Sequence, residues 1–427
     1  MLRHLVALAA LVLASALLSV PKSTLAAGAK VVSTKSKAKA VAAFRPRTTA
    51  TAKPKSWAPK DCAWRSGDVN TKRMPELMKA KGFRPPAGFA AFVAVVELKA
   101  GSKDAAISRM VTYDWEGTSD RVSGWNAAST VKIFSAVSAV ELMRRQGFPK
   151  GADVAIVTAQ GERNYPFTKL LSESLSASDN LAHDRLTLLA GFDDLHDSRG
   201  TLARAGLQQS AVMRAYQGKD WEAQGFDRSF RASPSVTLRT RQRTVLVPAR
   251  EGQAKVDCGG AACTSLQELS KFMCVVMLHE HLPAARQLAI ASKQDHYLLN
   301  VLREALRRKR DHKRDLVWEA LSAAFPARTA GAYPLYKKGG FADDWVSDSY
   351  YIVGRGQRRY LLSIAASGGW NALDGAGKIL AGLLKTGAFD PKPLAKPSAK
   401  PVAKKSSLAP APGKPPKSPA APPARAR

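Results

Sequence analysis

The chain has 427 residues, of which 66 are Lys or Arg, 34 are Asp or Glu and 45% are hydrophobic. This length and apolar content suit one large globular domain or two modest ones, and they exclude a chain that is disordered throughout. The net charge of +32 is unevenly spread, because residues 28–60 and 391–427 each carry nine Lys or Arg and no acid. The remainder therefore has a basic but ordinary surface charge.

Residues 1–29 are typical of a secretory signal peptide. A short basic start precedes an apolar run of Leu, Val and Ala, and a stretch of small residues ends at Ala29. An uncleaved membrane anchor is the alternative, but the run is short for a spanning helix, and no later segment is apolar for long enough to span a bilayer. We therefore expect a secreted or periplasmic protein that is soluble after cleavage.

Both basic segments that flank the domain are expected to be disordered. Residues 30–60 are rich in Lys, Ala, Thr and Pro, and residues 391–427 hold eleven Pro among 37 residues, so neither buries enough apolar surface to fold. They are either solvated spacers or arms that bind an anionic cell-envelope polymer in a salt-sensitive way. Nucleic acid is not expected as a partner, because aromatic residues are not interleaved with the basic ones. The folded domain is assigned to residues 61–390.

Four cysteines in an exported chain are candidates for disulfides, and they allow three pairings. Cys258 and Cys263 enclose Gly-Gly-Ala-Ala just before an expected helix, which favours a bond between them, whereas Cys274 lies on the apolar face of that helix. Buried free thiols are the alternative. The seven His are scattered and none pairs with a Cys at finger-like spacing, so we expect no metal and no other cofactor.

Strands are expected at both ends of the domain, with helices between them. A helix with an apolar stripe begins at Ser129 and ends near residues 144–147, and helices dominate to about residue 325 before a last helix at residues 370–384. The expected strands are residues 91–98, 109–113, 335–338, 349–353 and 360–366. This order predicts an α/β sandwich, in which an antiparallel sheet built from both termini is flanked by helices and carries an inserted all-α subdomain.

Ser129 and Lys132 are the first candidate catalytic residues. They stand three apart at the start of a helix and face the same side, so the amine can approach the hydroxyl. A desolvated Lys loses its proton near neutral pH and activates a serine for nucleophilic attack. The backbone N–H groups at the helix start can stabilise an oxyanion. A capping Ser followed by a surface Lys has the same spacing and is the structural alternative.

Two further segments of the sequence match motifs that accompany such a serine–lysine pair in known enzymes. Ser178-Asp179-Asn180 alone is typical of a helix N-cap, but S-x-x-K, S-D-N and K-T-G together are the signature of class A β-lactamases and penicillin-binding proteins. The literal Lys385-Thr386-Gly387 lies at the end of the last helix, where Gly is an ordinary cap. Lys338-Gly339-Gly340 lies on a strand instead, although Gly339 replaces the hydroxyl residue and Lys337 is the alternative match for the lysine.

On these motifs the chain resembles the class A β-lactamase-like serine hydrolases, within the penicillin-recognising enzymes, over about residues 85–388. The resemblance implies a role for each of several residues in an acyl-transfer reaction. They are the nucleophile Ser129, its activating base Lys132, the proton relay Ser178, the amide-binding Asn180, the carboxylate-binding Lys338, and Gly340 and Phe341 of the oxyanion-hole strand. The backbone N–H groups of Ser129 and Phe341 would form that hole.

The glutamate that deacylates the family's acyl-enzymes has no clear match. The best alignment puts Gln217 at its position, and an amide cannot accept a proton as a carboxylate does, while Glu222 is the alternative if the loop is longer. We therefore predict that a proper deacylation base is missing and that penicillins acylate Ser129 and leave slowly. His183 and Asp184 are expected on the surface of the helix that follows Ser178-Asp179-Asn180.

Two extra segments, about residues 218–257 and a basic helical stretch at residues 302–323, are expected to flank the cleft as surface insertions. If they have no functional role, the first is a solvated surface loop and the second a charged helix face.

Three functions stay open. The first is an exported serine hydrolase that opens β-lactam amides, which would imply β-lactam catabolism and antibiotic resistance. The second is a hydrolase or penicillin-binding protein that acts on D-amino-acid peptides or other envelope amides and deacylates poorly. The third is a non-catalytic envelope-binding module, against which the retained polar groups argue, because unpaired burial costs roughly 1–3 kcal/mol for each group. The expected partner is a small β-lactam or peptide-like amide, and the expected state is a monomer.

Overall fold

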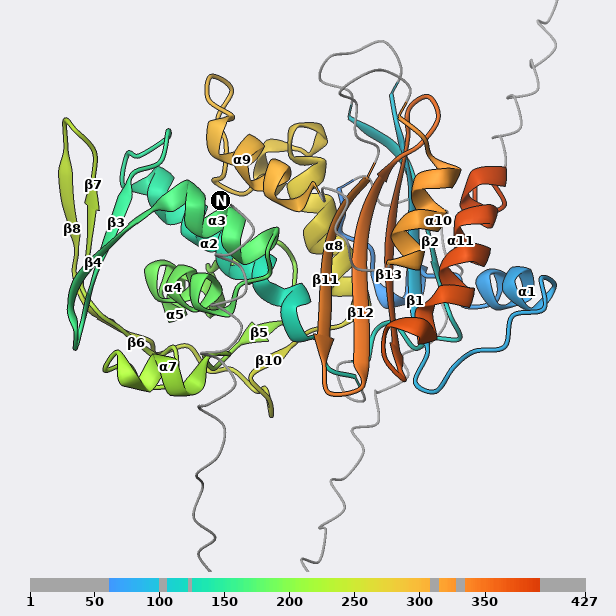
Figure 1. Ribbon diagram of the computed structural model, residues 1–427. Coiled ribbons are helices and arrows are strands. Elements are labelled where there is room, and N and C mark those ends of the chain that lie inside the picture. Colours follow the sequence, from blue (N-terminus) through green and yellow to red (C-terminus); the bar gives the residue numbers. More distant parts are fainter. Residues whose placement is uncertain (1–60, 100–105, 122–124, 308–314, 328–334, 392–427) are drawn as a thin grey trace, which may run out of the picture. The chain divides into compact units, whose positions relative to one another are not determined.

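The computed structural model describes residues 61–99, 106–121, 125–307, 315–327 and 335–391 (Figure 1). The expected signal peptide, the N-terminal linker and the tail beyond Pro391 lie outside these residues. The described residues all belong to one unit of the chain, Ser56–Arg427. None of the helices in the described ranges has the length and apolar character needed to cross a membrane.

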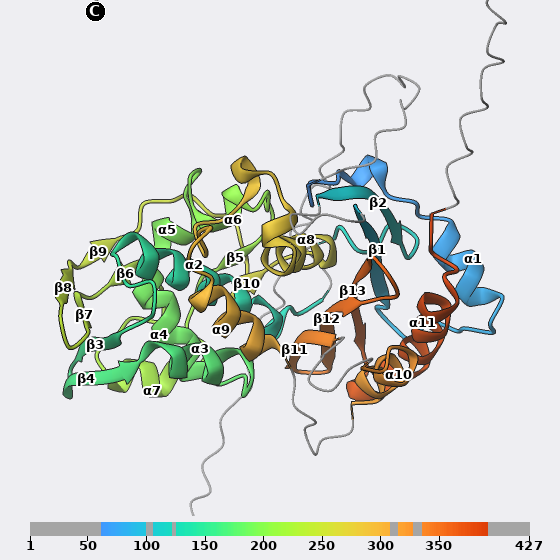
Figure 2. The same ribbon diagram turned by 90° about the horizontal axis from the view of Figure 1, so that it is seen from above.

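A five-stranded antiparallel sheet is built from both ends of the domain, as the sequence predicted (Figures 1 and 2). The strands are β1 Ala90–Leu98, β2 Ile107–Asp114, β11 Leu335–Ala342, β12 Trp345–Val353 and β13 Arg358–Ser367. Their order is β11-β12-β13-β1-β2, so the last strand of the sheet lies beside the first, and β1 also pairs with β2 in antiparallel fashion. Strand β11 is an edge strand, and it borders the candidate site.

Both faces of this sheet are covered, which explains why β1 is an almost continuous apolar run. Successive side chains of a strand point to opposite faces, so Val93 and Val95 join one core while Phe92 and Val96 join the other. Three helices cover the first face and one covers the second (Figure 2). They are α1 Arg73–Lys79, α10 Leu316–Ala324 and α11 Asp374–Thr386 on the first, and α8 Leu266–Met277 on the second.

The inserted helical subdomain is centred on α2, Lys132–Arg145, which is buried along most of its length. The buried Glu141 carboxylate of α2 accepts hydrogen bonds from the Thr201 hydroxyl (2.6 Å) and the Ala289 N–H (2.8 Å). The other helices here are α3 Phe167–Leu175, α4 Asn180–Ala190, α5 Phe192–His196, α6 Thr201–Arg204, α7 Gly218–Ala223 and α9 Tyr297–Leu306. With the sheet and its flanking helices, they confirm the predicted fold class.

The prediction that the inserted subdomain is all-α is wrong, because it contains a second antiparallel sheet. Its order is β4-β3-β7-β8, and the strands are β3 Asp153–Thr158, β4 Gly161–Pro166, β7 Val236–Arg239 and β8 Thr244–Val247. Two further pairs hold two residues in each strand: β5 Ala211–Val212 with β10 Ala262–Cys263, and β6 Ala232–Ser233 with β9 Arg250–Glu251. Strands of two to six residues give too few positions for an alternating pattern to stand out.

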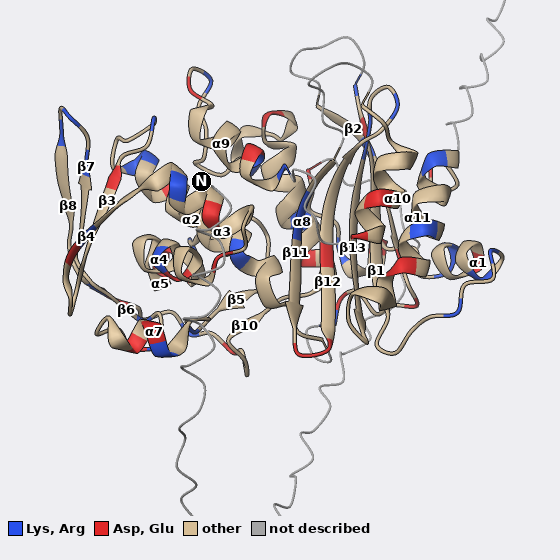
Figure 3. Cartoon of the chain, in the orientation of Figure 1, with Lys and Arg blue, Asp and Glu red and all other residues tan. Residues whose placement is uncertain are grey.

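The two expected insertions are organised differently from each other. The segment at residues 218–257 contains α7, β7 and β8, so it contributes to the second sheet. The basic stretch at residues 302–323 is divided between α9, which ends at Leu306, and α10, which begins at Leu316, and most of its basic run lies outside the described residues. Figure 3 shows acidic and basic residues interspersed along the same elements, as expected for an ordinary surface.

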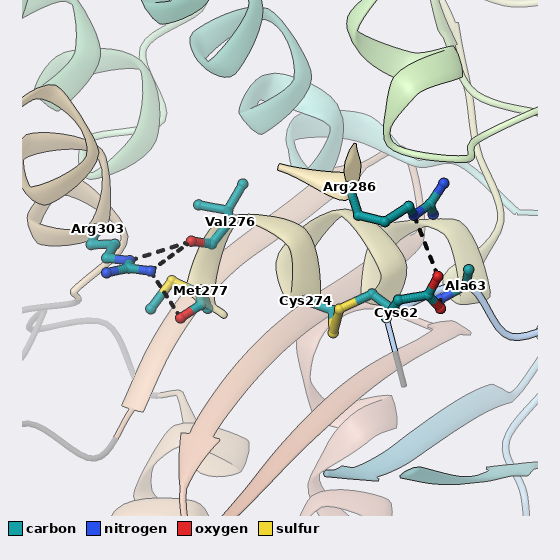
Figure 4. Close-up of a disulfide and its surroundings, with 8 residues drawn as sticks. Cys62, Ala63, Cys274, Val276, Met277, Arg286 and Arg303 are labelled. Carbon is teal, nitrogen blue, oxygen red and sulfur yellow. Dashed lines mark hydrogen bonds and ion pairs between the residues drawn. A yellow bond between two sulfur atoms is a disulfide. The ribbon is translucent and has the colours of Figure 1, made fainter. Parts of the chain in front are cut away.

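All four cysteines form disulfides. Cys258 is bonded to Cys263, as predicted, and Cys62 is bonded to Cys274 across a sequence separation of 212, so the free-thiol alternative is wrong. Figure 4 shows Cys274 on α8, where Arg303 of α9 also donates hydrogen bonds to two main-chain carbonyls at the helix end (2.9 and 3.0 Å). Helix α8 is thereby tied both to the N-terminal segment and to α9.

Candidate active site

Ser129 lies in a short 3-10 turn, η2 Ala128–Val131, that leads directly into α2. The preceding residue, Ala128, has φ +43°, a left-handed conformation that a residue with a Cβ rarely adopts. The Tyr216 hydroxyl donates a hydrogen bond to the Ala128 carbonyl (2.7 Å) and so helps to hold this turn. Ser129 is half-buried and lines a cavity of about 1330 Å³.

Lys132 is the first residue of α2, and its side chain is buried. Its ammonium donates hydrogen bonds to the Ser178 carbonyl (2.5 Å) and to Asn180 Oδ1 (2.6 Å). Burial lowers the pKa of this lysine to about 8, although the nearby carboxylates of Asp184 and Asp179 oppose the shift. A substantial fraction of Lys132 is therefore neutral near physiological pH, as a general base requires.

The Ser178-Asp179-Asn180 segment connects α3 to α4. Asp179 caps α4 by accepting a hydrogen bond from the Ala182 N–H (2.7 Å). For this one residue, the structural alternative of a helix N-cap is therefore correct. Its neighbours face the site instead: Ser178 has φ +58°, and its hydroxyl accepts a hydrogen bond from the Lys338 ammonium (2.9 Å). The segment thus serves both the helix and the site.

Glycine at position 340 allows strand β11 to approach the serine turn. A Cβ there would lie 2.7 Å from the Ala127 carbonyl oxygen and 3.0 Å from the Thr130 nitrogen, so any side chain would push β11 away from η2. This close approach brings Phe341, whose N–H is the second predicted oxyanion donor, into the same cavity wall as Ser129. The position of Gly340 therefore has a steric explanation.

Lys337 and Lys338 point to opposite faces of β11, and only Lys338 contacts Ser178. Lys337 is buried, and its ammonium pairs with the carboxylates of Asp315 (2.5 Å) and Asp348 (2.8 Å). A Cβ at Gly339 would lie 2.7 Å from Asp348 Oδ1, so a Thr or Ser at this position would clash with the buried ion pair. The ion pair explains why the hydroxyl residue of the motif is absent.

Neither of the two residues considered for the deacylation base, Gln217 just before α7 and Glu222 within α7, reaches the cavity. The Gln217 side chain donates a hydrogen bond to Asp220 Oδ2 (2.7 Å), and Glu222 forms an ion pair with Arg228 (2.8 Å) at the surface. Neither residue is among the described ones that line the cavity. Tyr216 lies near Lys132 instead, with its ring centroid 5.7 Å from the Lys132 ammonium.

The surface position predicted for His183 and Asp184 is wrong, because both side chains are fully buried. Asp184 lies one helical turn after Asn180, on the same face of α4, and its two carboxylate oxygens accept hydrogen bonds from the N–H groups of Tyr216 and Gln217 (3.1 Å each). Burial raises the pKa of Asp184 to about 7 and lowers that of His183 well below its usual value. The i, i+4 spacing from Asn180 was the sequence signal for this placement.

The cavity brings together most of the predicted site residues on one side of Ser129. Its described lining comes from α3 and the segment after it, from α9, from β11 and from the turn before α11. These residues are Ser129, Ser172, Leu175, Ser176, Ala177, Ser178, Tyr297, Asn300, Val301, Glu304, Ala305, Leu306, Arg307, Asp315, Lys337, Lys338, Gly339, Gly340, Phe341 and Trp370. In contrast, the rejected Lys385-Thr386-Gly387 only closes α11, with Gly387 at φ +73°.

No family model and no curated protein matches the chain. Among solved structures, a class A β-lactamase from Bacteroides cellulosilyticus is 10% identical over 75% of this chain and 97% of that chain, with a TM-score of 0.45. A mutant of PBP-A, in an acyl-enzyme complex with penicillin G, is 13% identical over 74% of this chain and 98% of that chain, with a TM-score of 0.44. A β-lactamase from Burkholderia vietnamiensis is 14% identical over 73% and 95%, with a TM-score of 0.43. The predicted antiparallel sheet flanked by helices is present in the described residues.

Proposed function

We propose that the protein is an exported serine hydrolase that forms an acyl-enzyme at Ser129 from β-lactam or peptide-like amides and releases the acyl group slowly. The observation that carries the proposal is the environment of Lys132. Its ammonium is buried against Ser178 and Asn180, and its pKa is lowered to about 8, one helical turn from a serine at the wall of a cavity. This arrangement supplies a base for a serine nucleophile, as in other activated serines.

The reaction follows from the groups around the serine. The Ser129 oxygen attacks the amide carbonyl carbon while its proton moves to the neutral Lys132 amine. The N–H groups of Ser129 and Phe341 stabilise the oxyanion. When the carbon–nitrogen bond breaks, the Ser178 hydroxyl, which lies beside the Lys338 ammonium, gives its proton to the leaving nitrogen and is reprotonated from Lys132. The acyl group stays on Ser129, and in a β-lactam the leaving nitrogen stays attached.

Substrate positioning is assigned to Asn180 and Lys338. The Asn180 oxygen accepts a hydrogen bond from Lys132, so its NH₂ group remains as a donor to the carbonyl of the substrate's side-chain amide. Lys338 supplies positive charge next to Ser178 for a substrate carboxylate. The replacement of the motif's hydroxyl residue by Gly339 removes one donor to that carboxylate and supports weaker binding of carboxylate-bearing lactams.

Slow release is supported by the absence of a suitable carboxylate around Ser129 in the described residues. The acidic side chains that line this part of the cavity are already paired, Glu304 with Arg307 (2.9 Å) and Asp315 with Lys337 (2.5 Å). Burial raises the pKa of the Tyr216 hydroxyl, so this group stays protonated and does not act as a base at neutral pH. Water that reaches the acyl-enzyme therefore lacks an unpaired carboxylate among the described residues of the lining to activate it.

Export of the protein is part of the proposal. Two disulfides that use all four cysteines support an oxidising compartment, where such bonds persist. The alternative of a non-catalytic binding module is less well supported, because it gives no reason for the hydrogen bonds that join Lys132 and Lys338 to Ser178.

Intact-mass spectrometry of the purified protein mixed with penicillin G tests this function. We expect a long-lived adduct with the mass of one whole penicillin and no adduct on the Ser129→Ala variant. Accumulation of hydrolysed penicillin with only a transient adduct would contradict slow release and favour a working β-lactamase. The absence of both adduct and hydrolysis would favour the non-catalytic module.

A further inference from the structure

Three exposed aromatic side chains gather around the cavity that contains Ser129. Among the large hydrophobic residues that the described chain exposes, every aromatic one lines this cavity. They are Tyr297, Phe341 and Trp370, which are 45%, 48% and 42% exposed. Exposed aromatic rings are costly unless they serve contact with a ligand or partner, and their concentration at one cavity indicates such a role.

Two of these rings form a stacked pair on one wall. Phe341 of β11 and Trp370, in the turn before α11, have ring centroids 5.6 Å apart and planes 20° from parallel. The buried Lys337 ammonium lies 5.6 Å from the Trp370 ring, which helps to fix the orientation of the indole. The cavity therefore has two nearly parallel aromatic rings in its lining.

Helix α9 supplies both polar and apolar residues to the lining, the apolar ones including Val301. Tyr297, Asn300 and Glu304 follow one another at helical spacing on the exposed face of α9, whose other face is buried through leucines. Exposed Ser172 of α3 also lines the cavity. These polar residues offer hydroxyls, an amide and a carboxylate to a ligand.

The charge and volume of the cavity indicate which class of ligand it can bind. The charged residues of the described lining are matched with one another, Glu304 with Arg307 and Lys337 with two aspartates, while Lys338 belongs to the acyl-transfer site. A volume of about 1330 Å³ exceeds the roughly 300–1,000 Å³ typical of a small-molecule pocket. The cavity thus fits an extended and largely neutral ligand.

We propose that this cavity binds an oligosaccharide of pyranose rings, with one ring stacked against the Phe341–Trp370 pair and hydroxyls of the oligosaccharide bonded to the polar residues of α9. A pyranose has an apolar face of C–H groups and a rim of hydroxyls, which matches a lining that holds both aromatic rings and polar side chains. A purely apolar chain would leave those polar side chains unpaired. The inference deepens the proposed function, because it gives the amide substrate of Ser129 a glycan portion.

Isothermal titration calorimetry of the full chain with chitotetraose and with cellotetraose tests the proposal. We expect saturable binding of at least one tetrasaccharide to the wild type and to Ser129→Ala. Trp370→Ala should weaken that binding at least about tenfold, the effect of a lost aromatic contact and its buried area, whereas Trp370→Phe should keep most of it. Leu246→Ala, which removes an apolar side chain 65% exposed on β8, is the matched control and should change nothing.

Several outcomes would overturn the inference. The absence of saturable binding by either sugar would do so, as would equal affinity of Trp370→Ala and wild type, which would put the sugar elsewhere on the chain. Binding of a tetra-alanine peptide, but of neither sugar, with loss in Trp370→Ala would assign the aromatic wall to peptides. Thermal unfolding of each variant checks that the fold is kept. If the wild type binds sugar but is not acylated by penicillin, the proposed function is refuted and the sugar site is not. Sugar binding does not need the Ser129 hydroxyl, so the two results are independent.

Discussion

The two sides of Ser129 differ in the functional groups that they place near the serine. On one side, α2, the start of α4 and β11 bring Lys132, Ser178 and Lys338 into one hydrogen-bonded arrangement. On the other side, in the segment between β5 and α7, Gln217 is hydrogen-bonded to Asp220, and the ring of Tyr216 lies near the Lys132 ammonium. Forming and breaking an acyl-enzyme are separate steps, and the proposed function assigns only the first to this arrangement.

The largest effect is expected from Lys132→Ala. Removal of the base should slow acylation by penicillin G by about 10³-fold, within the range for loss of a general base. The rate of adduct formation is measured by intact mass at a fixed penicillin concentration. Lys169→Ala, which removes a lysine of α3 with a side chain 65% exposed, is the control and should react like the wild type. Acylation at an undiminished rate in Lys132→Ala would show that another group activates Ser129.

The neighbouring lysines of β11 should respond in opposite ways. Lys338→Ala should slow acylation by about 10²-fold, the usual cost of one electrostatic contact to the transition state, with little change in stability. Lys337→Ala should instead lower the free energy of unfolding by about 3–5 kcal/mol, because it leaves the buried carboxylates of Asp315 and Asp348 without their cation. Urea unfolding and acylation rates are measured on both variants. Equal loss of stability in the two would contradict their assignment to opposite faces.

A smaller effect is expected from pH alone. Only the neutral form of Lys132 accepts a proton, and its pKa is lowered to about 8, so the neutral fraction grows as pH rises through that value. Acylation should therefore be roughly tenfold faster at pH 9 than at pH 7 and should level off above. The rate is measured at constant ionic strength. A rate that falls over this range would mean that the protonated lysine is the active form.

The features that could be predicted from sequence are those that depend on residues close together in the chain. The apolar strands β1 and β13, the serine and lysine at the start of α2, and the Cys258–Cys263 bond each depend on residues close in sequence or on a long uniform pattern. The Cys62–Cys274 bond joins residues 212 apart, for which no local signal exists.

The choice between Lys337 and Lys338 could not be made from sequence for a related reason. Alternation along a strand requires the two side chains to face opposite ways, but it does not say which face meets Ser178. Asp315, which pairs with Lys337, comes from a different element, at the N-cap of α10. The i, i+4 spacing from Asn180 could have placed Asp184 on the buried face of α4, but its partners, two N–H groups of a loop, become visible only in the folded chain.

The smallest effect is expected at the position that the sequence suggested for the deacylation base. Gln217→Glu restores a carboxylate there, yet the wild-type side chain is directed to Asp220 within its own helical turn. Release of the penicilloyl group should therefore change less than about twofold, whereas a general base in the right place would add 10²–10⁴-fold. The half-life of the adduct is followed by intact mass after removal of excess penicillin. A glutamate at position 217 would be repelled by the nearby carboxylate of Asp220. The double variant Gln217→Glu with Asp220→Asn removes this repulsion. A much shorter adduct half-life in the double variant would show that the side chain at position 217 can turn toward Ser129.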